Sequence, residues 1–157
     1  MAAVSVQSGE GKCLNHVKKD QFKINLRLRH LSLDPGEIST ALDLKPTFSW
    51  KVGSRAGKIV HKWTIWHGLL AEGAGSKEYE KALKKSLLHL ESRQEWLKDS
   101  FGDDGEFDVI FDLYTDLDDG KICEVSFYPE LLMRLSKLNA GIQVNVWKDE
   151  KIEEITE

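Results

Sequence analysis

The sequence predicts a single α+β domain, with helices packed on one face of an antiparallel or mixed β-sheet. Segments with apolar residues at every second position, typical of strands, alternate along the chain with segments whose apolar residues recur at helical spacing. The length of 157 residues and the balance of 41% hydrophobic to 31% charged residues are ordinary for one domain. The predicted order of elements is ferredoxin-like, β-α-β-β-α-β-β-α-β.

The first predicted strand and helix lie between residues 22 and 46. Apolar residues occupy every second position from Phe22 to Leu28, which is typical of a strand with one exposed face. Asp34 is a good N-cap residue and Pro35 suits the first helical position, so a short helix is predicted over about 35–43. Pro46 ends that helix, because the residue before a proline avoids the helical region.

The central part of the chain is predicted to form two strands and the longest helix. A short strand over 47–52 is followed by a turn that begins at Gly53 and by a second strand over 58–67. Residues 68–75 contain three glycines and are predicted to form a loop. Apolar residues at helical spacing then predict a helix over about 77–99. We expect Trp63 in the core against this helix. Trp66, on the opposite face of its strand, is interpreted as a core or sheet-edge residue, with an exposed aromatic platform as the alternative.

The C-terminal part repeats the alternation of strand and helix. A strand over 107–113 is followed by a turn at Asp118 and Asp119 and by a second alternating run, so residues 107–114 and 121–127 are predicted to pair as a hairpin. A third helix begins at Pro129, and the last strand covers 142–146. Residues 1–20 are interpreted as a flexible polar leader, 21–148 as the domain and 149–157 as a charged tail.

Composition and motifs argue against several functional classes. The start of the chain resembles no secretory signal, which predicts a cytoplasmic location. The net charge of −4 argues against a nucleic-acid partner, because phosphates repel an acidic surface. The sequence contains no phosphate-binding loop, dinucleotide fingerprint or nucleophile motif, and we expect no cofactor and no metal. Cys13 and Cys123 predict no disulfide in a reducing compartment.

Two clusters are candidate partner-binding sites. Asp116, Asp118 and Asp119 fail the pattern of a calcium loop and are typical of a hairpin tip, but they could steer a basic protein partner. His61 and His67 are six residues apart in the sequence, which on a regular strand is too far to share a metal ion. Trp66 and His67 complete the candidate contact residues.

Several segments resemble the bacterial domain of unknown function 4279 family. They are residues 33–38 and 42–47, the helix after Pro129 and the strand after Gly141, within a stretch of about 20–148. The family has no assigned reaction, so the resemblance implies no catalytic residues. It implies a small bacterial protein and, by analogy, an immunity-like role. The structural positions of the family motif in this chain are Asp34, Pro35, Pro46, Gly53 and Trp63.

The sequence therefore predicts a non-enzymatic protein-binding module, of immunity-like or regulatory type, without a cofactor. One alternative is an enzyme with a dispersed active site around His61 and His67. A third hypothesis is a single-strand nucleic-acid binder that uses Trp66, which requires basic residues nearby. The sequence leaves the oligomeric state open.

Overall fold

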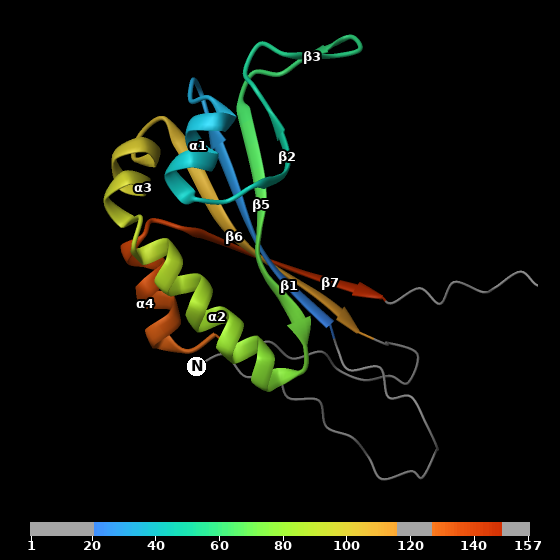
Figure 1. Ribbon diagram of the computed structural model, residues 1–157, viewed down its shortest axis with the longest axis vertical. Helices are drawn as coiled ribbons and strands as arrows, with labels where there is room; N and C mark the ends of the chain where they lie inside the picture. Colours follow the sequence, from blue (N-terminus) through green and yellow to red (C-terminus); the bar gives the residue numbers. More distant parts are fainter. Residues whose placement is uncertain (1–20, 116–126, 149–157) are drawn as a thin grey trace, which may run out of the picture.

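Five strands form one mixed sheet in the computed structural model, which describes residues 21–115 and 127–148 (Figure 1). The strands are β1 (Gln21–His30), β2 (Pro46–Trp50), β5 (Thr64–Ala74), β6 (Gly105–Thr115) and β7 (Gly141–Lys148). Their order across the sheet is β2-β5-β1-β6-β7, with β6 and β7 parallel and the other neighbours antiparallel. A separate hairpin pairs β3 (Arg55–Ala56) with β4 (Ile59–Val60).

The described helices all lie on the same side of the sheet (Figure 1). They are α1 (Pro35–Leu42), α2 (Ser76–Glu91), α3 (Gln94–Phe101) and α4 (Pro129–Lys137). The core fills the space between helices and sheet, where alternate side chains of β1 and β6 meet the apolar stripes of the helices. Its members include Phe22, Ile24, Leu26, Leu28, Phe107, Val109, Phe111, Leu83, Leu87, Leu97, Leu131 and Leu135. The predicted α+β class with a mixed sheet is confirmed.

Helix α1 begins as the sequence predicted. The Asp34 side chain accepts a hydrogen bond from the Gly36 backbone N–H at 2.8 Å, and Glu37 completes a capping box by accepting from the backbone N–H of Asp34. Pro35 occupies the first turn. These contacts satisfy backbone donors that the helix itself leaves unpaired, so the helix start is fixed locally.

The ferredoxin-like order of elements that the sequence predicted is not confirmed. The strand predicted over 58–67 is instead divided between β4 and the first residues of β5. The single helix predicted over 77–99 is two helices, because Arg93 leaves the helical region at φ −113° and ψ 13°. The Ser92 hydroxyl donates to the His89 carbonyl at 2.7 Å, a local bond that competes with helix continuation.

The predicted glycine-rich loop over 68–75 is wrong, because β5 continues to Ala74. The glycines make room for aromatic rings. A Cβ at Gly68 would lie 2.2 Å from the Trp66 indole, and one at Gly73 would lie 2.9 Å from the Phe22 ring. A glycine within a strand often marks such a close approach. Only Gly75, at φ 88°, serves the turn into α2.

The predicted hairpin between residues 107–114 and 121–127 is not formed by the strands that the structure shows. Strand β6 pairs with β1 on one side and with β7 on the other, so both of its edges are occupied. Residues 121–126 of the predicted partner lie outside the described residues. Phe127 packs on Phe111 with ring centroids 5.3 Å apart.

Candidate binding surface

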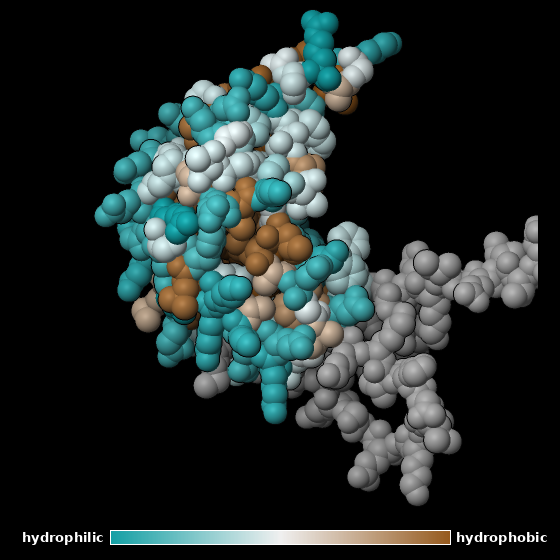
Figure 2. Space-filling view, in the orientation of Figure 1, coloured by the Kyte–Doolittle hydropathy of each residue, from teal (hydrophilic) through white to brown (hydrophobic). Residues whose placement is uncertain are grey.

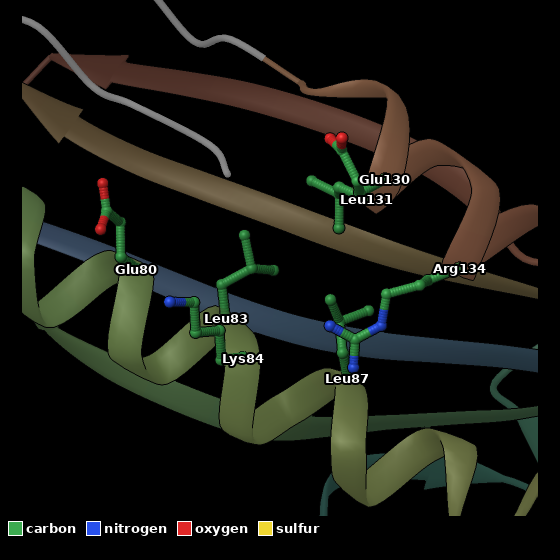
Figure 3. Close-up of a pocket in the computed structure, with 7 residues that line it drawn as sticks. All are labelled: Glu80, Leu83, Lys84, Leu87, Glu130, Leu131 and Arg134. Carbon is green, nitrogen blue, oxygen red and sulfur yellow. The ribbon is translucent and has the colours of Figure 1, made fainter.

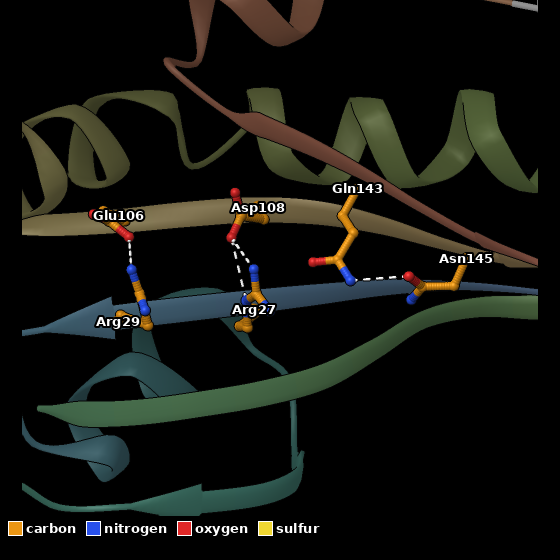
Figure 4. Close-up of polar contacts among 6 residues, drawn as sticks. All are labelled: Arg27, Arg29, Glu106, Asp108, Gln143 and Asn145. Carbon is orange, nitrogen blue, oxygen red and sulfur yellow. Dashed lines mark hydrogen bonds and ion pairs between the residues drawn. The ribbon is translucent and has the colours of Figure 1, made fainter. Parts of the chain in front are cut away.

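The face of the sheet opposite the helices carries polar and aromatic side chains, and we call it the open face. Side chains alternate along a strand, so the residues between the core positions of β1 and β6 project here. Arg27 pairs with Asp108 at 2.7 Å, and Arg29 pairs with Glu106 on the neighbouring strand (Figure 4). These ion pairs neutralise the arginines of the central strand.

A buried carboxylate organises the other half of the open face. Asp112, 9% exposed, accepts hydrogen bonds from Asn25 at 2.6 Å, Asn145 at 2.7 Å and the Trp147 indole at 3.0 Å. Asn145 also accepts from Gln143 at 2.9 Å (Figure 4). The network joins β1, β6 and β7. Both oxygens of Asp112 are engaged, so this carboxylate is a structural acceptor.

Four rings form a continuous cluster at the β2–β5 end of the open face, and we call Phe48, Trp50, His61 and His67 the ring cluster. Phe48 stacks on His67 with centroids 4.7 Å apart and planes 11° apart. Trp50 stacks on His61 at 5.0 Å and 8°, and the centroids of Phe48 and Trp50 are 5.2 Å apart. Phe48 is nevertheless 42% exposed and Trp50 43% exposed. The cluster is thus an ordered aromatic surface in contact with solvent.

The two histidines of the cluster lack the partners of a catalytic base. The Nδ1 atom of His67 and the Nε2 atom of His61 are buried, and neither has a hydrogen-bond partner in the described part of the chain. Burial lowers the pKa of His67 because it disfavours the charged form; Asp112 opposes this effect and Arg27 adds to it. His67 is therefore an uncharged ring at neutral pH.

Metal binding has no candidate ligand set among the residues that the structure describes. No group of three or more His, Cys, Asp or Glu residues there is placed to hold a metal ion. Over the same residues, no helix is long and apolar enough to cross a membrane.

The segment that carries most of the ring cluster is basic, a signal that the sequence-based predictions did not use. From Leu44 to Ala71 the chain contains no Asp or Glu, whereas five Lys or Arg residues lie between 45 and 62. All five are exposed: Lys45, Lys51, Arg55, Lys58 and Lys62. Lys51 pairs with Asp34 at 2.7 Å, which lowers the pKa of Asp34 through its hydrogen bond. For the other four, no ion pair is found within the described residues.

The structure places both predicted tryptophans. Trp66 is fully buried, and its indole donates to the Ser39 hydroxyl at 2.9 Å beneath α1, so the alternative of an exposed aromatic platform at this position is wrong. Trp63, expected in the core against the long helix, is half-buried and lies beneath the Arg29 guanidinium, 5.7 Å from the ring centroid. The exposed platform is formed by Phe48 and Trp50, which the sequence analysis did not name.

The remaining predicted site residues divide into three groups. His67 belongs to the ring cluster together with His61. Asp116, Asp118 and Asp119 lie outside the described residues, so their role in steering a basic partner stays a prediction. The family-motif positions serve local structure: Asp34 and Pro35 begin α1, Pro46 begins β2, and Gly53 takes a φ of 80° that favours glycine.

The helix side of the molecule offers a less convincing site. A shallow pocket lies between α2 and α4 (Figure 3). The Arg134 side chain that lines it forms a two-pronged ion pair with Glu91, at 2.6 and 2.8 Å, and this pair ties the two helices together. Seven residues line the pocket: Glu80, Leu83, Lys84, Leu87, Glu130, Leu131 and Arg134. Its leucines belong to the core and its arginine is paired with Glu91, so we assign the pocket a packing role.

Comparison with known proteins identifies the family. The family model described as Domain of unknown function (DUF4279) matches residues 20–149. The chain belongs to this family. No curated protein and no solved structure matches it. The match covers every strand of the sheet and all four described helices, so the ring cluster and the basic segment around it lie within the DUF4279 domain.

Proposed function

We propose that this DUF4279 protein is a non-enzymatic binding module whose contact surface is the ring cluster. One observation carries the proposal: Phe48 and Trp50 are held in place by stacking on two histidines, yet more than 40% of each side chain is exposed. Exposed aromatic side chains in a fixed arrangement are typical of binding surfaces, where aromatic residues supply much of the energy.

The alternative proposal, an enzyme around His61 and His67, has weaker support. A general base requires a partner that fixes its tautomer, and the described residues provide none for the buried nitrogens of these rings. Asp112, whose charge acts on His67, already accepts hydrogen bonds from three other side chains. An immunity-like or regulatory role fits the proposed module, because such proteins act by binding alone.

A panel of simple probes tests the binding surface. The probes are a fluorescent oligothymidylate of 12 nucleotides, a heparin oligosaccharide, a decaglutamate peptide and a decalysine peptide. We expect at least one probe to bind the full chain, and the Phe48→Ala/Trp50→Ala variant to lose that binding while keeping its circular-dichroism spectrum.

The matched control is Leu88→Ala/Leu132→Ala, which removes two apolar side chains that are 63% and 43% exposed on the helix side. This variant should bind as the parent does. The proposal is wrong if no probe binds, or if the two double variants change binding equally.

A further inference from the structure

We propose that the ring cluster binds single-stranded nucleic acid. This inference rests on the binding role proposed above and names the class of ligand. It combines three observations: two exposed rings of β2 that stack on imidazoles, four exposed cations in the same segment of the chain, and the absence of acidic residues from that segment.

The rings provide platforms for bases. Phe48 and Trp50 lie two residues apart on β2, which separates them by about 6.6 Å along the strand. Each ring has one face against an imidazole, at plane angles of 11° and 8°, and keeps 42–43% of its side chain exposed. Unpaired bases stack on such rings without regard to sequence, because every base has a π-face.

The cations provide contacts for phosphates. Lys45 precedes β2, Arg55 and Lys58 belong to the β3–β4 hairpin, and Lys62 precedes β5. All are exposed, and hydrophilic side chains project from the end of the molecule where this hairpin lies (Figure 2). By contrast, Arg27 and Arg29 in the middle of the sheet are neutralised by acidic residues of β6. Four exposed cations without an ion pair in the described residues thus belong to residues 45–62, the segment that also carries Phe48, Trp50 and His61.

The net charge of −4 does not oppose this assignment. Residues 149–157 contain five acidic residues and one lysine, which leaves 21 acidic and 21 basic residues in the rest of the chain. Charges are screened beyond roughly 8–10 Å at physiological salt, so the cations of residues 45–62, a segment without acidic residues, act on a strand bound at the rings.

Single strands are favoured over duplexes, because the flat faces of bases are accessible only when they are not stacked on each other. Cations that contact the backbone make binding dependent on salt, since phosphate contacts release counterions. A ligand that is charged but has no aromatic rings would contact the lysines and would not stack on Phe48 and Trp50.

Fluorescence anisotropy tests the proposal with labelled oligothymidylate and oligouridylate of 12 nucleotides, a 12-base-pair duplex and a heparin oligosaccharide, from 25 to 200 mM salt. We expect the full chain to bind both single strands more tightly than the duplex. Phe48→Ala/Trp50→Ala should weaken this binding at least about fivefold, the effect of losing one stacked base. Lys58→Gln/Lys62→Gln should lower the slope of log affinity against log salt by about 1.4, or roughly 0.7 for each contact.

The controls are Leu88→Ala/Leu132→Ala for the rings and Lys84→Gln/Lys85→Gln, two exposed lysines of α2, for the charges. Neither should change affinity or slope. Heparin or duplex binding as strong as single-strand binding, and insensitive to the ring variant, would overturn the proposal. Binding of decaglutamate or decalysine alone, lost in the ring variant, would also overturn it while leaving the binding module intact. If no probe binds, both proposals fail.

Discussion

Trp66 and His67 are neighbours in β5 but lie in opposite environments. Trp66 points towards the helices, is fully buried and bonds to Ser39 of α1. His67 points to the open face, is half-buried and stacks on an exposed phenylalanine. Adjacent residues of β5 thus lie on opposite faces of the sheet. One face packs against the helices, and the other carries the surface proposed to bind a ligand.

This difference follows from where the helices pack. Alternation along a strand identifies two faces, and the face that receives helices becomes core. On the covered face, large side chains fill the space under the helices, and a glycine such as Gly68 leaves room for them. On the open face, polar groups pair across strands and aromatic rings stack at the edge. Substitutions should therefore reduce stability most on the covered face and reduce binding most at the ring cluster.

The largest effect is expected for Trp66→Ala. Removing a buried indole leaves a cavity, which lowers the free energy of unfolding by roughly 3–5 kcal/mol. For a domain of this size the melting temperature should fall by about 10 °C or more. Trp50→Ala is the control, and its free energy of unfolding should fall by only about 1 kcal/mol. Thermal melting of the two variants measures the difference between the faces. Equal losses for the two tryptophans would contradict the comparison.

Gly68→Ala should be nearly as damaging, because the added methyl group meets the Trp66 indole at 2.2 Å. Overpacking of this kind costs about 1–3 kcal/mol. The double variant Gly68→Ala/Trp66→Leu provides the test, since the shorter side chain leaves room for the methyl. Chemical denaturation should show that the glycine substitution costs less in the Trp66→Leu background than in the parent. Additive losses would mean that the two residues do not interact.

On the open face, Asp112→Ala should destabilise by about 1–3 kcal/mol. The substitution leaves the side chains of Asn25, Asn145 and Trp147 without their acceptor, and Asn25 is buried. Asp108→Ala, which breaks a half-exposed pair with Arg27, is the control and should cost less, about 0–1 kcal/mol. Urea denaturation measures both. A larger loss of stability for Asp108→Ala would show that Asp112 is not the main stabilising acceptor of the open face.

Much of the fold was predictable from local patterns. Period-two runs located β1, β6 and β7, and capping chemistry located the starts of α1 and α4. The errors arose where a tertiary contact decided the structure. The sequence around Gly68 resembles a loop unless the contact of this glycine with the Trp66 ring is known, and after the break at Arg93 the second helix places Leu97 and Phe101 in the core.

The candidate site was less predictable than the fold. Trp63 and Trp66 are three residues apart, so alternation assigned them to opposite faces, but no local signal indicated which face the helices cover. The prediction placed the helices on the Trp63 side of the strand, and this was wrong. Phe48 and Trp50 were recognised as part of a strand, and their exposure follows from the edge position of β2. The absence of acidic residues from 44 to 71 is the signal that could have identified this region.

The smallest predicted effect concerns the pH dependence of stability. Burial lowers the pKa of His67 below its ordinary value of 6.5, so the unfolded chain binds a proton more readily than the folded chain. The contribution of His67 to stability is therefore complete above about pH 6.5 and is lost as the pH falls through the lowered pKa. We expect the melting temperature of the parent to fall more between pH 8 and pH 5 than that of His67→Gln, which keeps the other four histidines. A nuclear magnetic resonance titration assigns the effect directly, because the ring protons of His67 should titrate below pH 6.5. A titration at or above that value would show that burial of the ring does not disfavour its charged form, which contradicts this prediction.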